Sequence, residues 1–545
     1  MFEEPHLRPR AANFQPLTPV GFLTRAAEAH PHRTAVIWRD ATWDYAGLHA
    51  MAVRMAEALR AAGIGRGDVV SIVARNRPEM LAAHFAVPAL GSVLSTLNIR
   101  LDAGALGYIL AHSESRLLLC DPACAGAAGE AARATGVRML TLADPGEGPA
   151  PDRLDLLTGG SAAPPLDASA VTEEWQPICL NYTSGTTGAP KGAVYHHRGA
   201  FLNAMGNAMT LGFGATTSYL WTLPMFHCNG WAHTWAVTAA GGTHVCLDAV
   251  EPAAIFDLIA RHGVSHMCCA PVVLYMLLAD PAAEAHRARL AAGEAGRVAV
   301  GTGGAAPSAH LIEQLGTLGF DLTHLYGLTE SYGPASICQT GEALEGASNE
   351  RKAAWLARQG YRHATSGTIR IAATGGAGGA GGDAPPDGET QGEILLRGNT
   401  LMAGYYRDAT ATERAFAGGW FHTGDLGVRD TDGAIRVTDR EKDVIISGGE
   451  NIASIEVEGV LHRHPAVLLA AVVAMPSAKW GELPCAFVEL KPGHETAPDE
   501  LEAFCRGQLA TFKVPRHYRF GELPKTATGK IQKFLLRQRL MDEAE

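Results

Sequence analysis

The feature that most constrains the fold is a repeated alternation between helical and extended apolar patterns. Apolar residues recur at helical spacing from Leu23 to about Gly65, most clearly over residues 48–59. A short β-branched run follows at residues 68–73, and helical spacing returns at residues 79–90. Further short apolar runs occupy residues 117–120, 245–247 and 298–301. This alternation predicts βα units on a parallel sheet, and therefore an α/β fold.

The chain is too long for a single ordinary core, because 545 residues exceed the size at which chains divide into domains. A charged run at residues 439–443 suits a linker, and residues 444–446, 470–473 and 485–490 then predict the strands of a second unit. We expect a large N-terminal domain of stacked βα subdomains over residues 1–439 and a small C-terminal α+β domain over residues 440–545. Within the large domain, the Gly-rich residues 375–392 predict a loop or a flexible insertion.

Composition excludes several classes of function. The net charge is −11, without a dense Lys/Arg tract, which argues against a nucleic-acid partner. No apolar run reaches membrane-spanning length, and the N-terminus lacks the apolar core of a secretory signal. Ten scattered cysteines without paired Cys-x-x-Cys spacing indicate reduced thiols, not a zinc site. We therefore expect a cytoplasmic protein with no stable membrane insertion.

Residues 182–192, Tyr-Thr-Ser-Gly-Thr-Thr-Gly-Ala-Pro-Lys-Gly, predict a phosphate-binding loop. Glycines let the backbone approach an anion, hydroxyls and N–H groups donate to phosphate oxygens, and the lysine adds positive charge. A Walker A loop is disfavoured because Pro190 precedes Lys191 and Gly192 follows it, where that motif needs Gly-Lys-Ser/Thr. A flexible surface loop is the simpler alternative. The apolar run at residues 178–180, typical of a buried strand leading into the loop, favours the phosphate site.

Other segments carry side chains suited to a small ligand. Residues 218–231 include His227 and Trp231, which could line a pocket or belong to the core. The small residues at 301–307 would let a flat ring lie against the backbone at the end of a strand. Residues 326–330 combine an aromatic ring for stacking, a hydroxyl for phosphate and a carboxylate for magnesium. Lys530 stands on an irregular loop, where a catalytic cation could move.

Together these motifs resemble the adenylate-forming superfamily of acyl-CoA synthetases, luciferases and peptide-synthetase adenylation domains. The matching segments are residues 182–188, 326–330, 423–425, 439–440 and 524–530, in the order that the family has. Within the superfamily, the chain looks most similar to short- and medium-chain acyl-activating enzymes, including methylmercaptopropionate-CoA ligases. That finer likeness is carried by residues 224–231 and 446–452.

The resemblance implies a two-step reaction. A small carboxylic acid attacks the α-phosphate of ATP, with Mg²⁺, to give an acyl-adenylate, and coenzyme A then displaces AMP to form a thioester. We expect a short- or medium-chain aliphatic or methylthio acid, such as 3-methylmercaptopropionate. An aryl acid like benzoate or cinnamate is an alternative, as is a nucleotide-binding relative without turnover. A relative without turnover is disfavoured because it would have no need for Lys191, Glu330 and Lys530 together. Peptide-synthetase activity is disfavoured because residues 225–228 offer no aspartate for a substrate amine.

The resemblance also implies a role for each matching residue. The phosphate and magnesium contacts would come from Thr183, Ser184, Gly185, Thr186, Thr187, Gly188, Lys191, Thr329 and Glu330, with Thr183 and Glu330 assigned to the metal. The adenosine contacts would come from Gly303, Gly304, Ala305, His324, Tyr326, Gly327, Asp425 and Arg440. Many relatives have Asn or Asp at position 324, which leaves the contact to the adenine amine open.

The remaining roles concern the acid and the small domain. The acyl pocket is assigned to His227, Trp231 and Gly303, and the catalytic residues to Lys530, Thr329, Glu330 and His227. Lys530 would bridge the carboxylate and the α-phosphate during adenylation. The Gly448 and Gly449 loop would serve thioester formation after the small domain rotates about a hinge at Asp439. Dimers are common among such enzymes, so the resemblance also suggests a homodimer.

Overall fold

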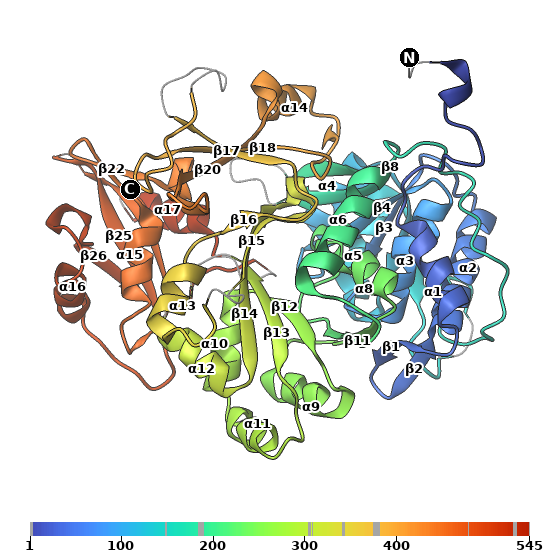
Figure 1. Cartoon of the computed structure of the whole chain (residues 1–545), viewed down its shortest axis with the longest axis horizontal. Coiled ribbons are helices and arrows are strands. Elements are labelled where there is room, and N and C mark those ends of the chain that lie inside the picture. The colour runs from blue at the N-terminus through green and yellow to red at the C-terminus, as the bar shows by residue number, and fades with distance from the viewer. Residues whose placement is uncertain are drawn as a thin grey trace.

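The computed structural model describes residues 4–147, 150–183, 190–303, 307, 309–339, 344–373, 382–477, 479–526 and 531–543. Two large sheets with helices between and around them make up most of the molecule, and a smaller lobe contains the C-terminal elements (Figure 1). The predicted α/β class with a large and a small unit is confirmed. The boundary between residues 439 and 440 stays a prediction.

The first sheet is mostly parallel, with antiparallel strands at both edges. Its described strands, in spatial order, are β16 (Tyr361–Arg362), β15 (Gly333–Cys338), β14 (Phe320–Leu328), β13 (Val298–Gly303), β12 (His266–Cys269), β10 (Ser218–Leu220), β11 (Thr243–Cys246), β1 (Thr34–Trp38) and β2 (Ala41–Asp44). Parallel strands need crossover helices, which bury the sheet on both faces. The runs predicted from residues 245–247 and 298–301 are β11 and β13.

The second sheet repeats this plan and ends in an antiparallel hairpin. Its described strands, in spatial order, are β19 (Gly404–Tyr405), β9 (Lys191–His196), β8 (Pro177–Thr183), β4 (Val93–Leu97), β3 (Val69–Val73), β5 (Ser115–Cys120), β6 (Arg138–Leu142) and β7 (Arg153–Leu154). All five residues of β3 are buried, as the continuous β-branched run predicts for a strand covered on both faces.

Helices separate and flank the two sheets (Figure 1). One apolar cluster joins both sheets to the inner helices α1 (Val20–Ala29), α2 (Tyr45–Ala61), α3 (Pro78–Ala89), α6 (His197–Leu211) and α8 (His233–Ala240). The outer face of the first sheet is covered by α9 (Pro252–His262), α10 (Pro271–Ala279), α11 (Ala282–Ala291) and α12 (Ala309–Thr317), with α13 (Asn349–Leu356) at its end. The outer face of the second sheet is covered by α4 (Ala103–His112) and α5 (Ala125–Thr135). Every face of both sheets is thus packed.

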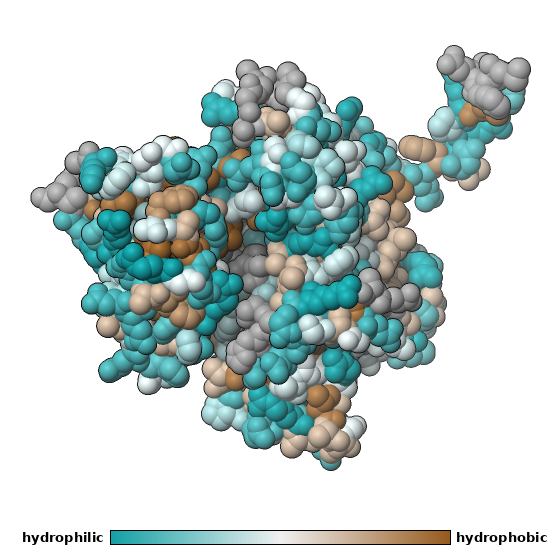
Figure 2. All heavy atoms as spheres, turned by 60° about the vertical axis from the view of Figure 1, so that its left-hand side comes forward, coloured by the Kyte–Doolittle hydropathy of each residue, from teal (hydrophilic) through white to brown (hydrophobic). Residues whose placement is uncertain are grey.

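Two further sheets complete the chain. An antiparallel sheet contains β17 (Thr368–Ala373), β18 (Gly392–Arg397), β20 (Phe421–Arg429) and β21 (Ile435–Arg440), next to α14 (Ala409–Ala415). The small lobe contains β22 (Ile445–Ser447), β23 (Glu450–Ile452), β24 (Val467–Ser477), β25 (Gly481–Leu490) and β26 (His517–Phe520), covered by α15 (Ser454–Leu461), α16 (Pro498–Arg506) and α17 (Lys533–Asp542). Apolar residues gather on the lobe's surface (Figure 2), where Ile446, Trp480 and Phe520 are exposed.

Two expectations need correction. The helical spacing predicted from Leu23 to Gly65 is interrupted by β1 and β2, because the β-branched run at Thr34–Trp38 pairs with β11 and becomes part of the first sheet. The charged run at residues 439–443 is also not an open linker. It starts inside β21 and continues as a 3₁₀ turn, η7 (Glu441–Asp443), and Asp439 is only 1% exposed.

Part of the Gly-rich segment predicted at residues 375–392 lies outside the described residues. No helix in the described part of the chain is both long and apolar enough to cross a membrane.

Candidate active site

The predicted phosphate loop joins two antiparallel strands. Thr183 is the last residue of β8 and pairs with Lys191, the first residue of β9. Residues 184–189, which include Ser184, Gly185, Thr186, Thr187 and Gly188, lie outside the described residues. The next helix, α6, begins only at His197, after all of β9. A Walker A loop leads from a strand directly into a helix, so this hairpin differs from it in topology as well as in sequence.

Thr329 and Glu330 lie where three parts of the chain meet. They form a 3₁₀ turn, η3 (Thr329–Ser331), at the end of β14. The hydroxyl of Tyr195 donates to the carbonyl oxygen of Thr329 (2.6 Å), and the thiol of Cys228 donates to its Oγ1 (3.4 Å). The hydroxyl of Tyr405 donates to Oε1 of Glu330 (2.7 Å). The second sheet thus fixes both residues through β9 and β19.

Lys191 stands beside this pair of residues. Its ammonium group lies 5.0 Å from the centre of the Tyr405 ring and 3.9 Å from a carboxylate oxygen of Asp408. Its side chain is 43% exposed, so the cation is held loosely and is accessible to an anion. Tyr405 therefore links the predicted phosphate lysine, at the start of β9, to the predicted magnesium carboxylate in η3.

Tyr326 and Asp425 form the other end of the site. The Tyr326 hydroxyl donates to Oδ2 of Asp425 (2.8 Å), and Nε of Arg440 lies 3.3 Å from Oδ1 of the same carboxylate. Burial and the adjacent carboxylate raise the pKa of Tyr326 well above its usual value, so its hydroxyl remains a donor. Asp425 and Arg440 face each other across β20 and β21. The sequence pattern predicted that these three residues act together, and they are in contact here.

His324 is fully buried, with its Nδ1 at the end of α13. This atom lies 2.7 Å from the carbonyl oxygen of Leu356 and 3.0 Å from that of Arg358. A carbonyl oxygen only accepts hydrogen bonds, so Nδ1 carries the proton. Its neighbours on β14 include Tyr326 and Gly327, and it pairs across the sheet with Thr302 of β13. The hydrogen bonds at Nδ1 support the backbone, and a contact to adenine stays a prediction.

The acyl-site candidates lie on a turn with unusual backbone geometry. The residues of α7 (Cys228–Trp231), together with Ala232, all have positive φ, although only Gly230 among them is a glycine. Left-handed backbone costs about 1–2 kcal/mol for each residue with a side chain. His227 precedes this turn and is partly buried, and its Nε2 lies 3.8 Å from the sulfur of Cys228. Strain of this size persists only where surrounding contacts fix the backbone.

Trp231 lies against two strands of the first sheet. A Cβ atom added to Gly303, at the end of β13, would be 3.9 Å from Cη2 of the Trp231 ring. A Cβ on Gly333, at the start of β15, would be only 2.9 Å from Cβ of Trp231. Trp231 and Gly303, both predicted for the acyl pocket, are therefore neighbours. Gly304 and Ala305 lie outside the described residues.

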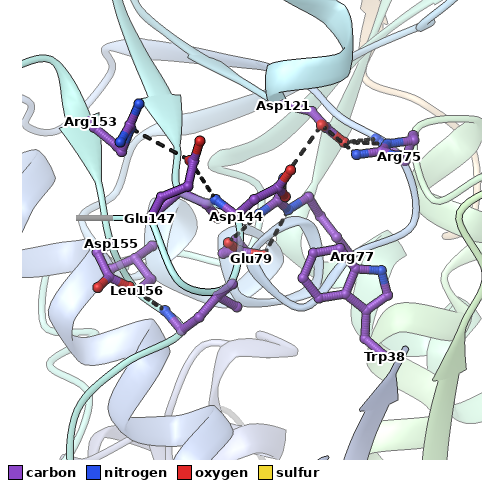
Figure 3. Close-up of polar contacts among 12 residues, drawn as sticks. Trp38, Arg75, Arg77, Glu79, Asp121, Asp144, Glu147, Arg153, Asp155 and Leu156 are labelled. Carbon is purple, nitrogen blue, oxygen red and sulfur yellow. Dashed lines mark hydrogen bonds and ion pairs between the residues drawn. The ribbon is translucent and has the colours of Figure 1, made fainter. Parts of the chain in front are cut away.

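A buried ionic cluster lies around Arg75 and Arg77 (Figure 3). Arg75 pairs with both carboxylate oxygens of Asp121, and Arg77 pairs with both oxygens of Glu79. Between the two arginines, Asn76 donates to the carbonyl oxygens of Trp221 and Leu223, and its own side-chain oxygen accepts from the N–H of Met225. Because the arginines are fixed by ion pairs, Asn76 holds the backbone just before His227 in place.

The predicted hinge residue is tied to the small lobe. The carboxylate of Asp439 accepts hydrogen bonds from the backbone N–H and the hydroxyl of Ser454, at the start of α15. Lys533 of α17 donates to the same hydroxyl (2.7 Å). Burial raises the pKa of Asp439, and Lys533 opposes this shift. Asp439 thus lies in β21 and also caps α15 of the small lobe.

The remaining small-lobe candidates are Gly448, Gly449 and Lys530. Both glycines have positive φ, at +62° and +89°, and a Cβ on Gly448 would meet the Trp480 ring at 2.9 Å. Backbone freedom and this close contact both require glycine at position 448. Lys530 lies outside the described residues.

The residues predicted for Mg²⁺ fit that ion. Mg²⁺ is commonly held by one or two carboxylates together with substrate phosphates and water. Glu330 supplies one carboxylate, and Tyr405 contacts both Glu330 and Lys191. Within the described ranges, no group of three or more His, Cys, Asp or Glu residues could hold a metal by itself.

Sequence reasoning missed the residues that support the site. Cys228, Tyr195 and Tyr405 contact Thr329 or Glu330. Cys228 lies within residues 224–231 but was given no role, and Tyr195 and Tyr405 lie in none of the motifs singled out. Burial raises the pKa of the Cys228 thiol to about 11, so it is a neutral donor and not a nucleophile. Because Cys228 directly follows His227, a predicted site residue, the sequence did contain a signal that Cys228 lies near the site.

Comparison with known proteins decides the family. The AMP-binding enzyme family matches residues 23–406, and the AMP-binding enzyme C-terminal domain matches residues 456–530. The chain belongs to the AMP-binding enzyme family. It is 40% identical to an acetate–CoA ligase of Humulus lupulus, over 97% of this chain and 95% of the relative. It is 42% identical to a peroxisomal butyrate–CoA ligase of Arabidopsis thaliana, over 96% and 93%.

Solved structures of AMP-binding enzymes agree with this assignment. The o-succinylbenzoate–CoA synthetase of Bacillus subtilis, in complex with its acyl-adenylate intermediate, matches with a TM-score of 0.77 and 28% identity, over 96% of this chain and 98% of that one. The present chain is therefore an AMP-forming acid–CoA ligase, with ATP and coenzyme A as co-substrates. The predicted superfamily and enzyme class are confirmed. The finer likeness to methylmercaptopropionate–CoA ligases is not.

Proposed function

We propose that this ligase activates a small aliphatic acid of short to medium chain length, with methylthio acids such as 3-methylmercaptopropionate within its range. The observation that carries this proposal is the position of Trp231 beside Gly303 at the end of β13. A bulky ring at that place takes up volume that a long acyl chain would need. Relatives named for acetate, butyrate and 2-methylpropanoate support the same size of substrate.

An aryl acid is the second candidate. A trans-cinnamate:CoA ligase of Petunia hybrida is 40% identical over 97% of this chain and 94% of the relative, about as similar as the aliphatic ligases. Overall identity therefore does not separate the two substrate classes. Trp231 favours the aliphatic class, because a flat aryl ring needs a deeper pocket than a two- to four-carbon acid.

We assign the reaction to the residues as follows. The loop at residues 183–191 and Lys191 bind the β- and γ-phosphates, Thr329 donates to the α-phosphate, and Asp425 with Arg440 holds the ribose. Glu330 and Thr183 would hold Mg²⁺, which would neutralise phosphate charge when bound. The acid carboxylate attacks the α-phosphate and pyrophosphate leaves, while Lys530 stabilises the charge that develops. The sulfur of coenzyme A then attacks the acyl carbon and AMP leaves.

The contacts of Thr329 support its assigned role. Cys228 donates to its Oγ1, so the hydroxyl hydrogen of Thr329 is free to point at a ligand oxygen. Tyr195 holds the backbone of the same residue. A hydroxyl that is oriented before the reaction loses little entropy when charge builds on the phosphate.

The second step requires the small lobe to present the Gly448 and Gly449 loop in place of Lys530, by rotation at Asp439. A homodimer and a cytoplasmic location remain part of the proposal. Four of the relatives found are named as peroxisomal.

The size of the acyl site is tested by replacing Trp231 with glycine. Glycine also suits the φ of +55° at this position, so the variant relieves backbone strain as it removes the ring. We expect kcat/KM for five- to eight-carbon acids to rise relative to acetate, by about fourfold for each added methylene that becomes buried. Trp231→Phe is the matched control and should shift the profile less. An unchanged acid profile in Trp231→Gly would contradict the proposal.

A further inference from the structure

The left-handed turn, residues 228–232, is held by one buried side chain at its centre. Asn229 has φ +55° and ψ +37°, and it is completely buried. Its Nδ2 lies 3.1 Å from Nε2 of His84 in α3, and its Oδ1 accepts from Nδ2 of Asn181 in β8 (2.8 Å). A helix and a strand from outside the turn therefore hold opposite ends of one amide group.

The directions of these hydrogen bonds are fixed. Nδ1 of His84 lies 2.8 Å from the carbonyl oxygen of Met80, which only accepts, so Nδ1 carries the ring hydrogen. Nε2 is then an acceptor, and Asn229 donates to it. Burial lowers the pKa of His84 to about 4, so the ring stays neutral at physiological pH. Asn229 can satisfy both partners only as an amide, with its nitrogen toward His84 and its oxygen toward Asn181.

Other contacts prevent the turn from relaxing around Asn229. The hydroxyl of Thr234 donates to the carbonyl oxygen of Asn229 (3.2 Å), and Asn207 of α6 donates to that of Trp231 (2.7 Å). Gly230 lies so close to Trp221 that an added Cβ would be 2.4 Å from the indole ring. The backbone is thus enclosed on several sides.

The two ends of the turn reach opposite sides of the reaction centre. At one end, the sulfur of Cys228 contacts Oγ1 of Thr329 on the phosphate side. At the other end, the ring of Trp231 lies beside Gly303 on the acyl side. Because all residues between them are in one strained conformation, a loss of that conformation moves the ring relative to β13.

We propose that Asn229 is a positioning residue that sets acid selectivity, because its bonds to His84 and Asn181 hold Trp231 against Gly303. The proposal rests on the function proposed above only in that Trp231 limits the acyl site. Asn229 itself does not contact substrate. A purely structural role would affect all acids equally.

Two variants separate the backbone from the hydrogen bonds. Asn229→Gly keeps a residue suited to positive φ but removes both bonds, whereas Asn181→Ala removes one bond and leaves the turn's own sequence intact. Ser71→Ala is the control, since it breaks a buried hydrogen bond of similar kind to Ser115 (2.6 Å) within the second sheet. All three variants are compared with the unmodified full-length enzyme for thermal unfolding and for kcat and KM on straight-chain acids of two to eight carbons.

We expect Asn229→Gly and Asn181→Ala to flatten the acid profile. The ratio of kcat/KM for hexanoate to that for acetate should rise by up to about fourfold per methylene, mainly through the acid KM, while Ser71→Ala keeps the original ratio. Equal loss on every acid in both variants, at an unchanged ratio, would overturn the proposal. The substrate class is judged separately, from the unmodified enzyme: a preference for aryl acids there would refute the aliphatic assignment, and the variants' ratios on small and large aryl acids would still test Asn229.

Discussion

At the scale of single residues, the site depends on tyrosines as much as on the charged groups that the motifs contain. Tyr195, Tyr326 and Tyr405 each donate a hydrogen bond to the residue that the family pattern makes important. A tyrosine side chain combines a rigid apolar ring with a hydroxyl group. It can therefore reach from one sheet to another and donate a hydrogen bond there. These hydrogen bonds orient the residues to which we assign the chemistry.

Asp425 should matter most for ATP. If Asp425 accepts from the ribose, as we propose, the loss of one hydrogen bond to a charged acceptor costs about 1.5–3 kcal/mol, so Asp425→Ala should raise the KM for ATP roughly 10- to 150-fold. Tyr326→Phe keeps the ring but loses its bond to Asp425, and a smaller increase is expected. Steady-state kinetics at saturating acid and coenzyme A measure both effects. An ATP KM that Asp425→Ala leaves unchanged would remove this residue from the ribose site.

At the scale of elements, the connection at the end of β21 links the two units more firmly than a charged linker would. Asp439 is buried and accepts two hydrogen bonds from Ser454, so any rotation of the small lobe either carries this contact with it or breaks it. A hinge is a short segment that absorbs a change in φ and ψ, and we propose Asp439 for this role.

Asp439→Pro should slow thioester formation more than adenylation, because proline fixes φ near −65° and resists the rotation. The same substitution also removes the carboxylate that caps α15. Asp439→Ala is therefore the matched control, since it loses the carboxylate but keeps a flexible φ. Single-turnover rates of pyrophosphate release and of acyl-CoA formation separate the two steps. If both variants show the same ratio of the two rates, position 439 is not the hinge.

The sequence predicted these elements unevenly. Continuous β-branched runs such as residues 69–73 are buried on both faces, and this pattern identifies a strand without further information. Residues 34–44 were missed because two short strands between helices look locally like part of a helical region, and only pairing with β11, two hundred residues later, decides them. The left-handed turn at residues 228–232 was not predictable, since its conformation is imposed by contacts with α3, α6 and β8.

At the scale of the whole molecule, many histidines are buried and neutral. Burial lowers the pKa of several from 6.5 to about 3 or 4, among them His84, His196, His197, His233, His244 and His363. Each takes up a proton more readily in the unfolded chain. Between pH 6.5 and 4 the unfolded state thus binds more protons than the folded state, and the free energy of unfolding falls as pH falls.

We therefore expect a steep loss of stability below pH 6. His84 alone should contribute about 3 kcal/mol of destabilisation once the pH is below its folded pKa. Thermal unfolding at pH values from 7 to 4.5 measures the trend, and His197→Gln, which removes one titrating ring, should reduce the slope. A midpoint temperature that stays constant across this range would contradict the assignment of neutral buried histidines.

The most direct test of the proposed ligase reaction and its acid is acid-dependent AMP release from ATP. The release is measured across short, medium, branched, aromatic and methylthio acids, with and without coenzyme A. We predict turnover that requires coenzyme A and is highest for an aliphatic or methylthio acid of about two to six carbons. The reason is that the Trp231 ring beside Gly303 takes up volume that a longer acyl chain would need. Highest turnover on benzoate or cinnamate would contradict the role of Trp231. AMP release that is independent of coenzyme A would contradict the assignment of coenzyme A as the acyl acceptor.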